Sequence, residues 1–222
     1  MQDGEPTKIE RRPIASREWT ASKRVADVLA RSGISANTIS VLGMLSGVVS
    51  GLALASTGTF PEFARAGWLA GAAFAQCRLL ANMFDGMVAI QRGEASPVGE
   101  LYNEVPDRVS DAAILIGLGY AAGGSVILGF VAACVALFVA YVRAIGKAAG
   151  APNDFCGPMA KQHRMAIVTL VAVYCGVAPL RWQLEWSEWG PAAAGLLIIS
   201  VGGVLTALRR LIRSAAYLGK KT

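Results

Sequence analysis

The sequence predicts an all-α integral membrane protein with six transmembrane helices, preceded by a short amphipathic helix at the membrane interface. Three observations support this fold class. The 222 residues are 54% hydrophobic, with a mean hydropathy of +0.47, which is too apolar for an ordinary soluble domain. Six apolar stretches are each long enough to cross a bilayer as a helix. The basic residues gather on one side of the layout that these stretches imply.

The N-terminal part is expected to lie outside the membrane. Residues 1–15 are polar and predict a flexible tail. Residues 16–35 predict an amphipathic juxtamembrane helix, in which Trp19 and Leu29 face one side while Lys23 meets water. Such a helix can lie on the membrane surface, where basic side chains attract anionic head groups, or it can dock on the protein itself. The pattern leaves both alternatives open.

A six-helix membrane domain is expected over residues 36–208, followed by a basic cytoplasmic tail at 209–222. Hydropathy places the six helices at 38–57, 66–91, 98–121, 124–148, 164–180 and 189–208. In the first helix, Gly43, Gly47 and Gly51 recur every four residues. A stripe of such small residues predicts that a neighbouring helix packs closely against it.

Positive charge sets the orientation of this layout. Of the 21 Lys and Arg residues, only Arg65 and Arg181 fall on the outer side, and Arg78 lies within a span. The remaining basic residues lie in inner segments, so both termini are expected in the cytoplasm. The net charge of +6 follows from this topology, and we expect contact with membrane lipids and no nucleic-acid partner. The small size and the lack of a signal-peptide pattern favour a bacterial inner membrane.

Residues 82–111 interrupt the apolar sequence with carboxylate and amide side chains. Because a carboxylate at the bilayer centre costs about 2.5–3.5 kcal/mol even on lenient scales, such groups normally face a protein interior or a polar cavity. Helical spacing places Asn82, Asp85 and Ala89 on one face, with Arg78 on the same stripe. This stretch is therefore the candidate functional site.

A second oxygen-rich stripe is expected on the next helix. Its members are Asn103, Glu104, Asp107 and Asp111. Brought together by the intervening loop, the two stripes could hold a hard divalent cation such as Mg²⁺, which prefers oxygen ligands and shares its shell with substrate phosphates. The alternative is a polar seam that only joins the helices of the bundle.

A basic cluster is expected on the same cytoplasmic face. Arg143 lies near the end of the fourth span, and Lys161 and Arg164 lie just before the fifth. Basic groups at a helix start, where backbone N–H groups also point outward, can cradle a phosphate. The preference for basic residues on the cytoplasmic side of a membrane explains the same residues equally well. Both interpretations, phosphate binding and membrane orientation, therefore stay open.

The spacing of residues 82–107 resembles the signature of the CDP-alcohol phosphatidyltransferase family. That signature is an Asp, two residues, Asp-Gly, two residues, Ala-Arg, eight residues, Gly, three residues, Asp, three residues and Asp. Here the frame is filled, with every gap kept, by Asn82, Asp85, Gly86, Ala89, Ile90, Gly99, Asn103 and Asp107. The segment DRVSDAA at 107–113 is similar to the branch of the family that uses inositol phosphate.

The resemblance implies a transferase of phospholipid biosynthesis. Such an enzyme moves a phosphatidyl group from CDP-diacylglycerol, or a similar CDP-alcohol, to a small polar alcohol and releases CMP. It also implies Mg²⁺ or Mn²⁺ as cofactor and a homodimer. The acceptor alcohol stays open: inositol phosphate, glycerol phosphate, serine and other polyols all fit.

The resemblance also implies roles by position. Asp107 would be the catalytic base. The metal ligands would be Asn82, Asp85, Asn103 and Asp107, with Glu104 and Asp111 as further candidates. The nucleotide would meet Gly86, Ala89 and Gly99, with Arg92 as a further candidate. Phosphate or acceptor would meet Arg143, Lys161 and Arg164, with Arg78 and Arg108 as further candidates.

Three positions depart from the signature. Asn82 and Asn103 stand where the family has carboxylates, and Ile90 stands where it has arginine. Asparagine can ligate through its carbonyl oxygen but brings no charge, so a site meant for two divalent cations loses two negative charges. We therefore expect a divergent transferase with one dominant metal. The alternative is a catalytically impaired pseudoenzyme or scaffold that retains the fold, with or without nucleotide binding.

Overall fold

The computed structural model describes residues 19–93, 97–179, 182–183 and 188–220. Its regular elements are helices: α1 (Thr20–Arg31), α2 (Ala36–Thr59), the short 3₁₀ helix η2 (Pro61–Phe63), α3 (Ala64–Gln91), α4 (Pro97–Tyr120), α5 (Val126–Ala148), α6 (Lys161–Val177) and α7 (Pro191–Leu218). The all-α prediction is confirmed for these residues, and α2 to α7 correspond to the six expected helices. The tail expected at 1–15 lies outside the described residues.

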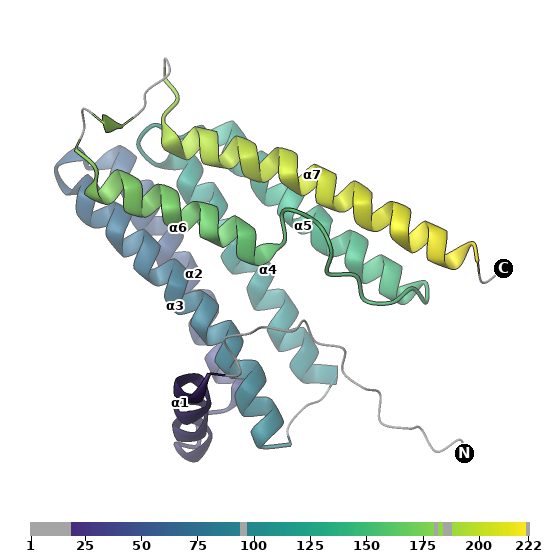
Figure 1. Cartoon of the computed structure of the whole chain (residues 1–222). Helices are drawn as coiled ribbons and strands as arrows, with labels where there is room; N and C mark the ends of the chain where they lie inside the picture. The colour runs from purple at the N-terminus through teal and green to yellow at the C-terminus, as the bar shows by residue number, and fades with distance from the viewer. Residues whose placement is uncertain (1–18, 94–96, 180–181, 184–187, 221–222) are drawn as a thin grey trace, which may run out of the picture.

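The helices share one apolar core. Helix α2 packs along both α3 and α4, α6 lies against α3, and α5 pairs with α7 (Figure 1). Leu54, Trp68, Leu115, Met165 and Leu196 belong to a single buried cluster that draws on α2, α3, α4, α6 and α7. This cluster fixes the relative position of the helices that carry the polar residues.

The glycine stripe of α2 allows the close packing that the sequence predicts. A Cβ atom at Gly47 would lie 2.4 Å from Ser110 Cβ of α4, and one at Gly51 would lie 2.3 Å from the Ala113 carbonyl oxygen. Such separations exclude any side chain at these two positions without movement of the helices. The stripe therefore brings α2 against the polar stretch of α4.

Helix α1 docks on the end of α3. Ala26 packs with Met83 and Met87 in a small buried cluster, and Gln91 Nε2 donates a hydrogen bond of 2.8 Å to Asp27 Oδ1. Trp19, just before the helix, is 65% exposed. One face of α1 is thus covered by the protein, as one of the two alternatives requires.

Helix α7 extends well beyond its expected end at residue 208 and continues to Leu218. The reason lies in tertiary contacts that hydropathy does not show. Arg210 is 5% exposed, and its Nε donates a hydrogen bond of 2.9 Å to the Cys156 carbonyl oxygen in the loop before α6. Much of the segment expected as a basic tail at 209–222 therefore continues the helix and packs on this loop.

Three helices of the described residues are long and apolar enough to cross a membrane. They are α2, α5 and α7. Each presents apolar side chains such as Leu52, Ile127 and Ile198 at its exposed surface, which is expected where lipid rather than water surrounds a helix. The fold is thus that of an all-helical membrane protein.

Candidate active site

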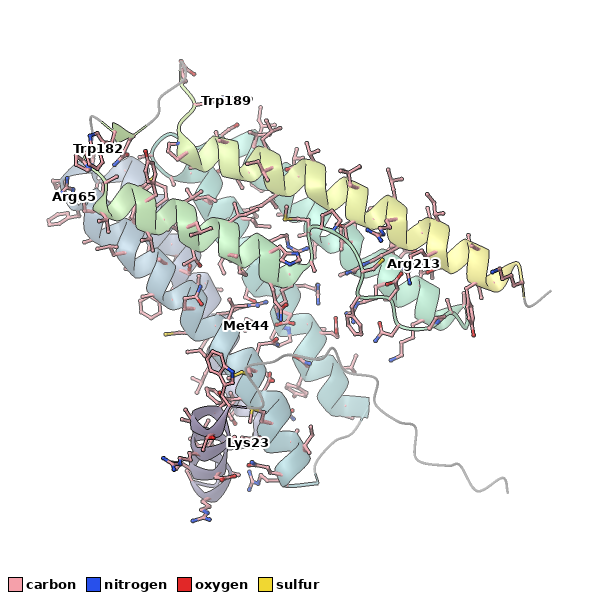
Figure 2. The ribbon with its side chains drawn as sticks, viewed as in Figure 1. Lys23, Met44, Arg65, Trp182, Trp189 and Arg213 are labelled. Carbon is pink, nitrogen blue, oxygen red and sulfur yellow. The ribbon has the colours of Figure 1, made fainter. Side chains whose placement is uncertain are left out.

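The two predicted polar stripes face one pocket between α2, α3 and α4. Its lining consists of Ser40, Gly43, Met44, Arg78, Asn82, Asp85, Asn103, Pro106, Asp107 and Ser110. The pocket measures about 190 Å³, including the space open to solvent, and Met44 marks its place in Figure 2. The structure therefore brings together four of the frame positions: Asn82, Asp85, Asn103 and Asp107.

Asp85 is a buried carboxylate held by uncharged donors. It is 4% exposed, and Ser40 Oγ of α2 donates a hydrogen bond of 2.6 Å to its Oδ2. The backbone N–H of Gly86 contacts its Oδ1. A hydrogen bond to an ionised group is about twice as strong as one between neutral groups, so Ser40 helps to fix this carboxylate toward the pocket.

The two asparagines are joined in a hydrogen-bonded cluster. Asn82 Nδ2 donates to Asn103 Oδ1 at 2.8 Å and to Asp107 Oδ1 at 3.0 Å. Two carboxylates at positions 82 and 107 would repel each other at this separation, whereas an amide N–H attracts the carboxylate. The Asn82 amide therefore links α3 to Asn103 and Asp107 of α4 by hydrogen bonds.

Arg78 is a fully buried cation beside the pocket. Its side chain is 1% exposed, and its Nη2 lies 3.1 Å from Asp107 Oδ1 and 2.6 Å from Asp111 Oδ1. The same nitrogen donates to the Asp107 carbonyl oxygen at 3.2 Å, and Nε donates to Ser110 Oγ at 2.9 Å. Arg78 thus joins α3 to three residues of one turn of α4.

Two further cations come from the start of α6. Lys161 Nζ forms an ion pair with Asp107 Oδ2, and Arg164 Nη2 lies 2.8 Å from Asp111 Oδ2. Both oxygens of each carboxylate therefore have a cationic partner when Arg78 is included. A buried charge pair needs such complete partnering to offset its desolvation. Helix α6 begins three residues before its expected start, and this extra turn carries Lys161 to the site.

Glu104 belongs to a neighbouring ionic cluster and does not line the pocket. Arg143 Nη2 lies 2.7 Å from Glu104 Oε2, and Arg108 Nη2 lies 2.8 Å from the same oxygen. The Arg143 guanidinium also stacks over the Phe155 ring, 5.4 Å from its centroid. The expected phosphate contacts are thus divided: Lys161 lies at the pocket carboxylate of Asp107, and Arg164 lies at Asp111 behind it. Arg143 and Arg108 surround Glu104, and Arg108 Nη2 also lies 4.0 Å from Asp107 Oδ2.

The residues expected to bind the nucleotide are not among those that line the pocket. Ala89 packs in an apolar cluster with Ala36 and Ile39, and Arg92 donates a hydrogen bond of 3.0 Å to the Ile34 carbonyl oxygen. Gly86 is next to the pocket residue Asp85. Gly99 lies in the first turn of α4.

Three residues of this region were not expected from the sequence. Ser40 and Ser110 bind Asp85 and Arg78, and Arg210 joins α7 to the loop before α6. A signal existed for Ser110, because it lies three residues after Asp107 on the same helical face. Ser40 and Arg210 reach their partners across helices, and no spacing within one segment reveals such a contact.

The loop before α6 holds a further polar cluster around Asp154. Asp154 Oδ1 accepts a hydrogen bond of 2.8 Å from the Cys156 N–H, and Asp154 Oδ2 pairs with Arg213 Nε at 3.0 Å. Burial, and next the hydrogen bond to Asp154, raise the pKa of the Cys156 thiol. Because the thiolate is the reactive form, this cysteine is poorly suited to nucleophilic chemistry.

The charge of the pocket suits one divalent cation better than two. Among the described residues, no group of three or more His, Cys, Asp or Glu side chains is placed to hold a metal ion. The pocket offers the carboxylates of Asp85 and Asp107 and the amides of Asn82 and Asn103. Two carboxylates balance the charge of one Mg²⁺ or Mn²⁺, and the amide oxygens are acceptable further ligands.

Relatives of known activity match most of the chain. A phosphatidylinositol phosphate synthase of Mycobacteroides abscessus is 28% identical over 195 residues, which cover 84% of each chain. One from Streptomyces avermitilis is 27% identical and covers 84% of this chain and 75% of its own. Both relatives are synthases of phosphatidylinositol phosphate by name.

Solved structures share the fold. The phosphatidylinositol phosphate synthase of Mycobacterium tuberculosis with CDP-diacylglycerol bound has a TM-score of 0.69 at 25% identity, over 87% of this chain and 92% of that one. The same enzyme with manganese and citrate has a TM-score of 0.70 at 24% identity, over 87% and 88%.

A family model agrees with these likenesses. It is that of the CDP-alcohol phosphatidyltransferases, whose members use Mg²⁺ or Mn²⁺. The model matches residues 34–218, a range that contains α2 to α7 and every residue of the pocket. The chain therefore belongs to the CDP-alcohol phosphatidyltransferase family.

Proposed function

We propose that this membrane enzyme transfers the phosphatidyl group of CDP-diacylglycerol to the hydroxyl of an inositol phosphate and releases CMP. The observation that carries the proposal is the single pocket that joins Asp85 and Asp107, the two retained carboxylates of the family frame. The names of the relatives support the donor and the acceptor. The segment at 107–113 supports the same acceptor class.

The four frame residues of the pocket would hold the divalent cation through side-chain oxygens. They are Asn82, Asp85, Asn103 and Asp107. When bound, the metal supplies positive charge for the diphosphate of the donor. Ser40 keeps the Asp85 carboxylate in place through its short hydrogen bond. Gly43 lets α2 pack close to α3 beside the pocket, because a Cβ atom added there would lie 2.8 Å from Ala81 Cβ.

Asp107 would take the proton of the acceptor hydroxyl. The hydroxyl oxygen then attacks the phosphorus that carries the diacylglycerol, a new P–O bond forms, and the P–O bond to CMP breaks. General-base catalysis of this kind contributes roughly 10²–10⁴-fold in rate. Arg78, Asn82 and Lys161 hold both oxygens of Asp107 and so fix its orientation before the substrates bind.

The acceptor phosphate would bind among the basic residues that flank the pocket. Lys161 pairs with the pocket carboxylate of Asp107, and Arg164 pairs with the neighbouring Asp111. Arg143 and Arg108 lie one turn away at Glu104. Guanidinium groups recognise phosphate through paired hydrogen bonds. The cluster would therefore select an alcohol that carries a phosphate over one that does not.

We also propose that α2 to α7 all cross the membrane, with α1 at its cytoplasmic surface. Helices α3, α4 and α6 turn their charged residues toward one another, so their apolar sides can face lipid. Figure 2 shows Arg65, Trp182 and Trp189 at one end of the molecule and Lys23 at the other. Exposed tryptophans are typical of an interface, and Trp182 is 63% exposed. The small number of basic residues toward the tryptophan end supports cytoplasmic termini, and the bacterial relatives support a bacterial inner membrane.

The test is CMP release from CDP-diacylglycerol by purified protein with Mn²⁺ or Mg²⁺, across a panel of alcohols. We expect release with inositol phosphate, and loss of at least 10²-fold in Asp107→Asn. Asp27→Asn on α1 is the matched control and should keep the wild-type rate. No release with any acceptor, together with no binding of CDP, would instead identify an impaired relative.

A further inference from the structure

Arg78 has no counterpart in the family signature, which begins four residues later at position 82. Nevertheless it lines the pocket and is the largest fully buried side chain among the described residues. A buried guanidinium is costly unless it is paired, and Arg78 is paired with both Asp107 and Asp111. Its place in the pocket therefore needs an explanation beyond packing.

The contacts of Arg78 occupy the oxygen that a second cation would need. Arg78 Nη2 and Asn82 Nδ2 donate to the same atom, Asp107 Oδ1, at 3.1 and 3.0 Å. Lys161 pairs with the other oxygen of this carboxylate. The amide at position 82 and the guanidinium at position 78 thus act together: one removes a negative charge, and the other adds a positive charge.

One nitrogen of the Arg78 guanidinium, Nη1, remains available as a donor. Its Nη1 is buried and has no hydrogen-bond partner within the described part of the chain. A guanidinium offers five N–H donors, and a buried donor without a partner is unfavourable. A phosphate oxygen that enters the pocket would give this nitrogen an acceptor, and the charge of the donor diphosphate suits a fixed cation.

We propose that the pocket takes a single divalent cation and that the Arg78 guanidinium stands in place of a second one, binding a phosphate oxygen of the donor through Nη1. The inference rests on the proposed function for the identity of the donor. Of the four frame residues, Asp85 would then be the main charged ligand, because its protein contacts come from uncharged groups.

The first test counts metal ions. Mn²⁺ binding to the detergent-solubilised full chain, in the presence of CDP, is measured by electron paramagnetic resonance. We expect one Mn²⁺ per wild-type chain. The triple variant Arg78→Met, Asn82→Asp, Asn103→Asp should bind two, because it restores both carboxylates and removes the competing cation. Two Mn²⁺ per wild-type chain would overturn the inference, and so would a folded triple variant that still binds only one.

The second test does not depend on the triple variant. The affinity for CDP is measured by calorimetry, with Mn²⁺ and with EDTA. We expect Arg78→Gln to bind CDP roughly 10- to 100-fold more weakly under both conditions, since it loses a charge-assisted hydrogen bond. Arg65→Gln, at the outer end, is the matched control. Unchanged CDP affinity in Arg78→Gln would overturn the inference. CMP release tests the proposed function separately, so the two failures are distinguishable.

Discussion

Asn82 shows how a single residue can change a metal site without disturbing the frame around it. The position is kept, and the side chain still faces Asp107, but the contact is an amide hydrogen bond of 3.0 Å instead of a pair of like charges. Asp107 Oδ1 therefore has hydrogen-bond donors before any cation binds. A site built of four carboxylates would need metal to relieve their repulsion.

The hydrogen bond from Asn82 to Asp107 predicts the effect of a carboxylate at position 82. Without metal, Asn82→Asp should lower the free energy of unfolding by about 1–3 kcal/mol, because two buried carboxylates then meet without the amide donor. Mn²⁺ should recover a larger part of this loss than it does in Asn82→Ala, which loses the hydrogen bonds but adds no charge. The measurement is the melting temperature in EDTA and in Mn²⁺. An equal response of the two variants to Mn²⁺ would contradict the prediction.

Ser40 provides a second prediction at this scale. Ser40→Ala removes a buried hydrogen bond of 2.6 Å to Asp85 and should cost about 1.5–3 kcal/mol, as expected for a bond to a charged group. Ser46→Ala is the matched control on the same helix, because its hydroxyl donates to a neutral carbonyl oxygen at 2.9 Å. Chemical denaturation in detergent would compare the two. A larger loss in the control would contradict this role of Ser40.

The sequence predicted which residues are polar and share a face, but not which partners they choose. Asp85 and Asp107 were placed in one site by the spacing of the family frame, and the structure puts them in one pocket. The helical spacing of Glu104 also put it on the oxygen-rich stripe, as a candidate metal ligand. In the structure it pairs with Arg143 of α5 instead. Partner choice depends on the rotation and approach of neighbouring helices, which periodicity within one segment does not encode.

At the scale of elements, the glycine stripe of α2 controls how closely the site is assembled. Gly47 lies against Ser110, whose hydroxyl accepts a hydrogen bond from Arg78. The spacing of the glycines was sufficient to predict this close approach. The end of α7 was not predictable in this way, because the helix continues past residue 208 by packing Arg210 on a loop of irregular structure.

A methyl group at Gly47 should therefore open the site. The added Cβ would lie 2.4 Å from Ser110 Cβ, and overpacking of this kind costs about 1–3 kcal/mol. We expect Gly47→Ala to lower both the melting temperature and the rate of CMP release. Gly219→Ala is the control, since its Cβ would meet the Ala215 carbonyl oxygen at an ordinary 3.4 Å. Wild-type stability in Gly47→Ala would show that α2 and α4 separate freely.

At the scale of the whole molecule, charge and aromatic side chains distinguish the two ends. Arg65, Trp182 and Trp189 gather at one end, while Lys23 lies on α1 at the other (Figure 2). The family, the reaction class and the all-helical fold could be predicted because a fixed frame and apolar stretches are local signals. Among the described helices, length and composition identify only α2, α5 and α7 as candidate spans, because charged residues lower the hydropathy of α3, α4 and α6.

The proposed topology predicts which residues a membrane-impermeant thiol reagent reaches. In a background without the four native cysteines, Arg65→Cys should react in intact cells, because it lies on the outer side. Lys23→Cys should react only in inverted vesicles. Labelling is followed by a mass-tag shift on gels, and reaction of both positions from the same side would contradict the topology.

Under the proposed function, this pocket transfers a phosphatidyl group to an alcohol and not to water. The most direct measurement is mass spectrometry of the lipid formed from CDP-diacylglycerol and inositol phosphate, with Mn²⁺ and purified protein. We predict a lipid that carries the intact acceptor, formed in equal amount to CMP and absent in Asp107→Asn. Phosphatidic acid as the main product, or a lipid product that persists in Asp107→Asn, would contradict the claim.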